Sequence, residues 1–172
     1  MSLLPWINKY TPKETTDIPQ PSAVKELKTF IETFSKQKKK AALIYGPPGS
    51  CKTTAVYAVA KELNLELVEV NASDTRNAEQ IHAKIGNAIK QQSLFFQGKL
   101  ILIDEVDGVA GNDDRGGVSA LSELISSSHF PIVMTANDPW DKKFSSLRQK
   151  AVMISFGSLN YLSIANVLKA IC

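Results

Sequence analysis

The eight residues that follow a short apolar stretch have the composition of a phosphate-binding loop. They are Gly46, Pro47, Pro48, Gly49, Ser50, Cys51, Lys52 and Thr53. Backbone N–H groups at the start of a helix attract closely spaced negative charges, because the helix dipole adds to their attraction. The Lys52 ammonium suits the β- and γ-phosphates of ATP, and the Thr53 hydroxyl suits Mg²⁺. The run therefore predicts a site for ATP and Mg²⁺, with a ligand-free glycine turn as the alternative.

Cys51 departs from the usual pattern G-x-x-x-x-G-K-[ST], which has its second glycine at this position. A left-handed backbone strains a residue that carries a Cβ by about 1–2 kcal/mol, and the thiol would crowd the phosphates. Because Lys52 and most of the amide groups remain, we expect ATP to bind, but more weakly than with glycine at residue 51.

Two acidic residues and an amide complete a predicted ATP-hydrolysing site. Asp104 and Glu105 follow an apolar run at residues 99–103, and the carboxyl edge of an open α/β sheet is where ligands bind. Asp104 is suited to hold Mg²⁺ through a water molecule. Glu105 is suited to act as a general base that polarises the attacking water. Asn137 follows a later strand and is suited to orient the attacking water or to contact the γ-phosphate. The alternatives are ordinary surface charge for the acids and a turn role for Asn137.

Apolar periodicity predicts the elements that hold these loops. Strands are predicted at residues 41–45, 66–70, 99–103, 131–135 and 151–156. Helices are predicted at residues 22–34, 52–63, 77–90 and 118–126. Strands that alternate with helices indicate a parallel sheet covered on both sides, which is a three-layer α/β domain over residues 1–156.

The two ends of the chain differ from this pattern. Prolines punctuate residues 1–20, which predicts an irregular arm extended over the domain. Residues 157–172 carry an amphipathic stripe with no strand behind it. We expect this segment to be the first helix of a truncated helical lid domain.

Composition excludes some classes of protein. A chain of 172 residues with 44% hydrophobic residues can form one domain with a core. The net charge of +3 is compatible with nucleic-acid contact without requiring it, and the lysines at residues 36–40 are either a solvated helix end or such a contact. Cys51 and Cys172 lack the spacing of a disulfide framework or a zinc site. With no long apolar stretch and no signal sequence, we expect a soluble intracellular protein and no membrane.

The motifs together resemble the P-loop AAA+ ATPases. Segments 6–13 and 70–76 resemble boxes of clamp-loader subunits of the replication factor C family, and segments 103–108, 114–117 and 136–140 are similar to its large subunits. This resemblance covers nearly the whole chain. It implies a five-stranded parallel sheet in the order 5-1-4-3-2, and an N-terminal arm that brings Tyr10 and Pro12 near the adenine.

The same resemblance implies partners. A clamp loader uses ATP and Mg²⁺ to open a sliding clamp and place it on primer–template DNA, as a pentamer with replication factor C small subunits. Arg115 and the helix near Val118 are the candidate DNA contacts, and pairing of Arg115 with Asp113 or Asp114 is the alternative. The candidate clamp contact is the helix near residues 80–90 with segment 91–98, where Phe95 and Phe96 would insert unless they are core residues.

Two departures from the family pattern bear on activity. Small subunits carry a Ser-Arg-Cys motif whose arginine reaches the neighbouring ATP site, and segment 147–151 lacks it, so Arg148 is not expected to play that role. Thr11 stands where the family usually has arginine. Without the lid's sensor arginine and the collar of the pentamer, the isolated chain is expected to turn over ATP weakly or not at all.

Alternative functions stay open at this point. One is a scaffold subunit that binds nucleotide, hydrolyses it poorly and anchors the clamp. Another is a different AAA+ class, such as a helicase loader or a branch-migration motor. The start at Met1 directly before the first box is typical of an archaeal cytoplasmic protein, and a eukaryotic protein of this family would be nuclear.

Overall fold

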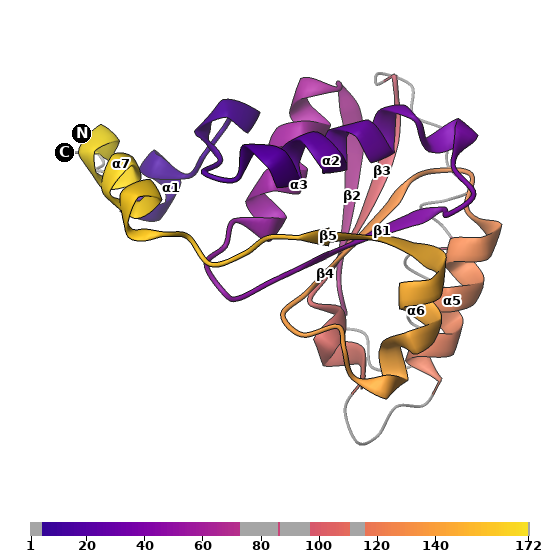
Figure 1. The fold of residues 1–172 in the computed structure, drawn as a ribbon. Helices are drawn as coiled ribbons and strands as arrows, with labels where there is room; N and C mark the ends of the chain where they lie inside the picture. Colours follow the sequence, from indigo (N-terminus) through magenta and orange to yellow (C-terminus); the bar gives the residue numbers. More distant parts are fainter. Residues whose placement is uncertain (1–4, 73–85, 87–96, 111–115, 172) are drawn as a thin grey trace.

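The computed structural model describes residues 5–72, 86, 97–110 and 116–171. Its centre is a sheet in which every pairing is parallel. The strands are β1 (Ala41–Tyr45), β2 (Leu65–Asn71), β3 (Gly98–Asp104), β4 (Ile132–Ala136) and β5 (Ala151–Ser155). Their spatial order is β2-β3-β4-β1-β5 (Figure 1). The predicted five-stranded parallel sheet and its order are confirmed.

Helices cover both faces of the sheet, which makes three layers. The helices on one face are α2 (Pro21–Glu32) and α3 (Lys52–Glu62), and those on the other are α5 (Gly117–Ser127) and α6 (Ser145–Lys150) (Figure 1). Within β1, Ala42 and Ile44 pack on the α2 and α3 side, whereas Leu43 packs on the α5 and α6 side. Because successive strand residues point to opposite faces, continuous apolar strands supply both halves of the core.

The N-terminal segment is more ordered than predicted. A short helix, α1 (Trp6–Tyr10), begins after Pro5, and a 3₁₀ turn, η1 (Thr15–Asp17), follows. The prediction of an irregular, extended arm was therefore wrong over these residues. Proline fits the start of a helix because it has no N–H to leave unpaired, and the Trp6 and Tyr10 rings pack edge to face at a spacing of four residues.

Two further helical details differ from the prediction. The helix α2 begins at Pro21, one residue before the predicted cap at Ser22, which places proline in its first turn. The short helix α6, directly before β5, was not predicted at all. The predicted helix at residues 77–90 lies outside the described residues except for residue 86.

The last helix, α7 (Tyr161–Ile171), lies beside α1 and away from the sheet (Figure 1). Its Tyr161, Leu162 and Leu168 side chains are more than half exposed. The predicted terminal helix is thus present, while its assignment to a lid domain, and the domain boundary at residue 156, stay predictions.

Register brings three loops to one level of the sheet. Tyr45 pairs with Ala136, and Ile103 pairs with Met134. Residues 46, 105 and 137 therefore leave their strands at the same edge, and this edge positions the candidate site.

Candidate active site

The loop between β1 and α3 has a backbone that depends on glycine at its first position. Gly46 has φ of 151°, and a Cβ added there would lie 1.8 Å from the carbonyl oxygen of Phe156. The main chain after β5 occupies that space because the Phe156 N–H donates to the Tyr45 carbonyl at 2.7 Å. Gly49, with φ of 77°, completes the turn.

Cys51 is in the left-handed conformation, with φ of 67° and ψ of 27°. The left-handed backbone that glycine would adopt freely is therefore kept with cysteine. This conformation strains a residue that carries a Cβ by about 1–2 kcal/mol. Burial raises the pKa of the Cys51 thiol, so the side chain stays neutral and adds no negative charge beside a phosphate.

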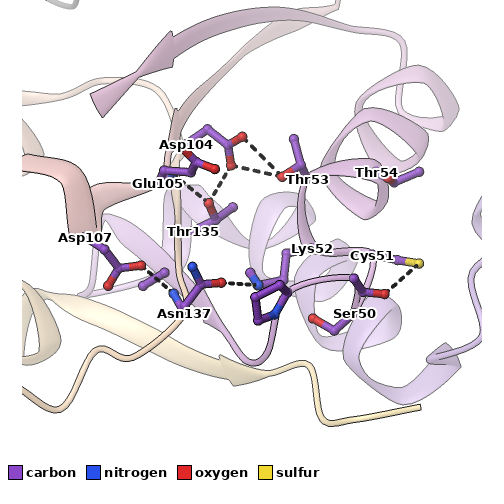
Figure 2. A pocket seen from close by; sticks show the side chains of 13 residues that line it. Ser50, Cys51, Lys52, Thr53, Thr54, Asp104, Glu105, Asp107, Thr135 and Asn137 are labelled. Carbon is purple, nitrogen blue, oxygen red and sulfur yellow. Dashed lines mark hydrogen bonds between the residues drawn. The ribbon is translucent and has the colours of Figure 1, made fainter. Parts of the chain in front are cut away.

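The start of α3 suits an anion. No side chain among the described residues caps it, so the first N–H groups, which lack partners within the helix, remain available. A cleft of about 440 Å³ lies there, lined by the loop residues 48–54 and by polar side chains from β3 and β4 (Figure 2). The dipole of α3 favours negative charge at this end.

Lys52 places a positive charge in the same cleft. Its Nζ donates to the carbonyl oxygens of Gly46 at 2.7 Å and Pro47 at 3.0 Å, and to Oδ1 of Asn137 at 3.0 Å. Burial lowers the pKa of Lys52, partly offset by the carboxylates of Asp107, Asp104 and Glu105. All three hydrogen bonds go to neutral oxygens, so the ammonium can exchange them for phosphate oxygens.

Oxygen atoms suitable for Mg²⁺ meet on the other side of the cleft. The Thr53 hydroxyl donates to Oδ1 of Asp104 at 3.0 Å, and the Thr135 hydroxyl donates to the same carboxylate oxygen (Figure 2). Mg²⁺ prefers oxygen ligands and keeps several waters. The chemistry of this donor set fits the ion, with Thr53 and Asp104 as the residues that would hold it.

Glu105 and Asn137 border the cleft as predicted. Glu105 is exposed and has φ of 55°. The Asn137 backbone N–H donates to Oδ2 of Asp107 at 2.6 Å, which fixes the start of the loop after β4. The structure thus brings together five of the residues predicted from the sequence for catalysis and phosphate binding: Lys52, Thr53, Asp104, Glu105 and Asn137.

Tyr10 and Pro12 lie elsewhere, in a second cavity of about 720 Å³ between the N-terminal segment and α7. Gln20 contacts the phosphate loop, because its Nε2 donates to the Ser50 carbonyl at 2.7 Å. The neighbours of Gln20 in sequence, Pro19 and Pro21, border the second cavity. A role for Tyr10 and Pro12 at the adenine therefore stays a prediction.

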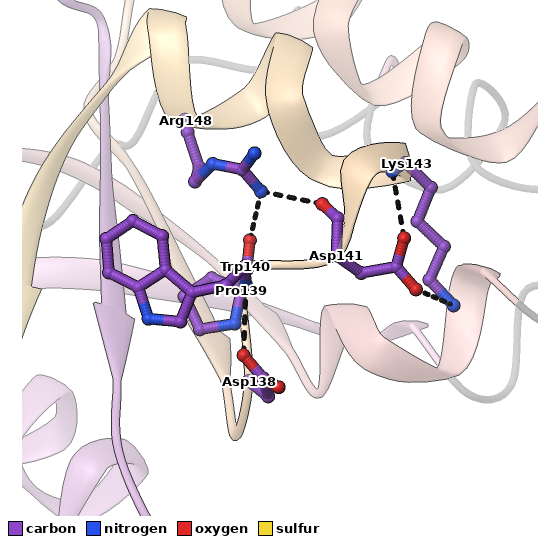
Figure 3. A network of polar contacts seen from close by, with 6 residues as sticks. All are labelled: Asp138, Pro139, Trp140, Asp141, Lys143 and Arg148. Atoms are coloured by element: carbon purple, nitrogen blue, oxygen red, sulfur yellow. Dashed lines mark hydrogen bonds and ion pairs between the residues drawn. The ribbon is translucent and has the colours of Figure 1, made fainter.

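Arg148 is engaged within the chain. Its Nη1 donates to the carbonyl oxygens of Pro139 and, at 2.7 Å, Asp141, and its guanidinium lies 5.7 Å from the centre of the Trp140 ring (Figure 3). The Trp140 ring in turn packs edge to face on Tyr45, the last residue of β1. Arg148 thus holds the loop that follows Asn137. The expectation that it does not reach a neighbouring subunit stays a prediction.

Several predicted contacts fall on residues that the structure does not describe. These are Arg115 with Asp113 and Asp114, the segment 80–90 apart from residue 86, and Phe95 and Phe96. In the part of the chain that is described, no cluster of three or more His, Cys, Asp or Glu side chains could hold a metal ion.

Three residues of the site were missed in the sequence. Thr135 contacts Asp104, Asp107 contacts the Asn137 backbone, and Gln20 contacts the phosphate loop. Asp107, two residues beyond the acidic pair, was the one with a visible signal. A threonine in a strand and a glutamine between prolines carry no such signal, because both types are common there for reasons of packing or turn structure.

A parallel sheet with a phosphate loop after its first strand and an acidic pair after another defines a nucleotide-handling α/β domain. The chain belongs to the AAA family, the ATPase family associated with various cellular activities, whose model matches residues 42–156. In sequence it is similar to archaeal replication factor C large subunits. It is 46% identical to that of Nanoarchaeum equitans over 170 residues, which cover 98% of this chain and 40% of the relative.

Two further relatives carry the same name. The protein of Staphylothermus marinus is 46% identical over 172 residues (98% of this chain, 41% of the relative), and that of Thermofilum pendens is 44% identical over 176 residues (100% and 43%). The predicted resemblance to this family is confirmed. The chain spans about two fifths of the length of these relatives. None of the described helices is long and apolar enough to cross a membrane.

Replacement of Cys51 by glycine tests the departure in the phosphate loop. Cys51→Gly is expected to tighten ATP binding by less than about tenfold, equivalent to about 1.4 kcal/mol, because it removes the Cβ and thiol from the cleft lining. The free energy of unfolding should change by less than about 1 kcal/mol, since relieved strain and the greater freedom of glycine in the unfolded chain oppose each other. Calorimetric titration with ATP and denaturant unfolding measure the two effects.

Cys51→Ala is the matched control, because it keeps a Cβ in the left-handed backbone and removes only sulfur. It should bind ATP with an affinity between those of the unaltered chain and Cys51→Gly. Identical affinities for all three proteins would show that residue 51 does not impair the loop.

Proposed function

We propose that this chain is the ATP-binding part of a clamp-loader large subunit of the replication factor C type, which uses ATP binding and hydrolysis to open a sliding clamp and load it on primer–template DNA. The observation that carries the proposal is the meeting of Lys52, Thr53, Asp104 and Asn137 in one cleft at the start of α3. The names of the relatives supply the particular family. They do not favour a scaffold subunit or another AAA+ class.

The phosphates of ATP would lie against the N–H groups of residues 49–53 and the Lys52 ammonium. Lys52 already bonds Asn137, so a γ-phosphate that draws Lys52 away from the loop carbonyls changes the contacts of Asn137 as well. Asn137 is therefore suited to report whether a γ-phosphate is present. Mg²⁺, held through Thr53 and Asp104, would neutralise the charge that develops on the phosphates.

Glu105 is the general base in this proposal. Its carboxylate takes a proton from water as the water oxygen bonds to the γ-phosphorus and the bond to the β,γ-bridging oxygen breaks. The exposed side chain of Glu105 borders the cleft, whereas Asp104 is held by two hydroxyl groups. The two neighbouring carboxylates thus have environments suited to different tasks.

The remaining parts of the proposal concern assembly. Tyr10 and Pro12 would contact the adenine, Arg115 the DNA backbone, and small subunits would complete the ring. Because the described site contains one cation near the phosphate loop, Lys52, the isolated chain is expected to hydrolyse ATP weakly. We place the protein in the cytoplasm of an archaeal cell.

Clamp loading tests the function. The complete protein that carries this chain is purified with its small subunits, and transfer of a labelled clamp to primed circular DNA is measured with and without ATP. Loading that requires both ATP and this protein is expected. ATP-dependent loading of equal rate by small subunits alone would overturn the proposal. Equal release of γ-phosphate by complexes with and without an intact Glu105 would instead indicate a subunit that binds nucleotide without hydrolysing it.

A further inference from the structure

We propose that Thr135 is a positioning residue for the acidic pair, Asp104 and Glu105. Its single buried hydroxyl orients the pair and thereby sets the response of the site to Mg²⁺. Thr135 lies in β4 and is 2% exposed. Its Oγ1 donates to Oδ1 of Asp104 and accepts from the backbone N–H of Glu105 at 3.0 Å. This inference rests on the proposed nucleotide site and adds a residue to it.

One hydroxyl can make both contacts at once, because it has one donor and two acceptor positions. The single proton of the Thr135 hydroxyl is used toward Asp104, so its orientation is fixed. A lone pair then faces the Glu105 N–H. The two hydrogen bonds therefore depend on each other, and loss of the oxygen removes both.

The position of Thr135 explains why a side chain is needed here. The strand β3 pairs with β4 at Ile101, Leu102 and Ile103, and the pairing ends at Ile103. Directly beyond it, Glu105 turns into the left-handed region, with φ of 55°, which costs a residue with a Cβ about 1–2 kcal/mol. The Thr135 oxygen replaces a strand partner for the Glu105 N–H at this turn.

Thr135 differs from Thr53, the other hydroxyl that contacts Asp104. Both threonines line the cleft, but Thr53 lies on the phosphate loop side, at the start of α3, whereas Thr135 lies in the sheet. The buried hydroxyl of Thr135 contacts Asp104 from the neighbouring strand, β4. Thr135 therefore orients Asp104 through Oδ1, while Oδ2 lies 3.3 Å from the hydroxyl of Thr53, the residue suited to the ion.

A residue that orients a metal-binding side chain changes the affinity of the site for the metal ion. Loss of a group that orients a metal-binding side chain typically lowers metal affinity ten- to a hundredfold. A packing role alone would affect the stability of the fold and leave the Mg²⁺ requirement unchanged. The two roles are thus separable by experiment.

The test uses Thr135→Val, which keeps the branched shape, and Thr135→Ser, which keeps the hydroxyl. Binding of a non-hydrolysable ATP analogue is measured by calorimetry over a range of Mg²⁺ concentrations and in EDTA, together with thermal melts. Thr135→Val is expected to raise the Mg²⁺ concentration for half-maximal binding about tenfold or more. In EDTA its affinity should match that of the unaltered chain, and Thr135→Ser should restore the Mg²⁺ response.

The matched control is Thr33→Val, directly after α2, where the hydroxyl donates to the Thr29 carbonyl and accepts from Nε2 of Gln37. An unchanged Mg²⁺ response in Thr135→Val would overturn the proposal, as would an equal loss of affinity with and without Mg²⁺. If Thr135→Val does not fold, the result for Thr135→Ser decides. A folded Thr135→Ser protein whose Mg²⁺ dependence of binding differs from that of the unaltered chain would contradict a role carried by the hydroxyl. Failure of the unaltered chain to bind the analogue would count against the nucleotide site itself.

Discussion

Lys52→Ala is expected to lower the affinity of the chain for ATP by at least about a hundredfold, equivalent to about 2.7 kcal/mol. The ammonium is the positive side chain of the cleft, and Asp104, Glu105 and Asp107 all lie near it. Without Lys52, a triphosphate would meet three carboxylates with only backbone N–H groups to oppose them. Calorimetric titration with ATP and Mg²⁺ measures the loss.

The stability of the fold should respond differently to this substitution. Because burial lowers the pKa of Lys52, folding disfavours its charged form, and removal of the charge is not expected to lower the melting temperature. Lys61→Ala, on the exposed side of the same helix, is the matched control and should bind ATP normally. Tight binding of ATP by a folded Lys52→Ala protein would refute the assignment of the phosphate site.

Glu105→Gln is expected to reduce ATP turnover by about a hundredfold or more while the affinity for ATP changes little. Glutamine has nearly the same shape but cannot accept a proton at neutral pH. The backbone contact of residue 105 with Thr135 is kept, so the geometry of the strand end should persist. The rate of γ-phosphate release is measured in the assembled complex, since the isolated chain is expected to be slow.

Glu32→Gln, on the exposed surface of α2, provides a control with the same chemical change away from the cleft. If Glu105→Gln and Glu32→Gln complexes release phosphate at equal rates, Glu105 is not the base. If Glu105→Gln abolishes binding as well, the residue has a structural role that masks its chemistry. A lowered melting temperature of the Glu105→Gln protein would indicate such a structural role, whereas an unchanged one would not.

Most of the fold could be predicted from the sequence because the core residues form local patterns of apolar side chains along the chain. The continuous apolar residues of β1 and β3 indicate strands buried on both faces, and both strands were placed within one residue at each end. The helix α3 follows the phosphate loop where proline and glycine end β1. The short helices α1 and α6 were missed because one or two turns leave too little periodicity to recognise.

The candidate site was only partly predictable. The residue types of Lys52, Thr53, Asp104 and Asn137 indicated their chemistry, and the family resemblance supported their roles. Thr135 gave no such sign, since threonine in a strand is ordinary. The separate cavity at Tyr10 and Pro12, and the contacts of Arg148 with its own loop, also could not be derived from spacing.

The sequence by itself determined the class of fold, the phosphate loop and the chemical groups available at the sheet edge. Apolar periodicity and glycine positions act over a few residues, so they can be read directly from the chain. Only the tertiary structure decided which groups meet: Lys52 bonds Asn137 across 85 residues, and Thr53 bonds Asp104 across 51. Such contacts follow from strand order and register, which no local pattern encodes, because they depend on how the whole sheet assembles.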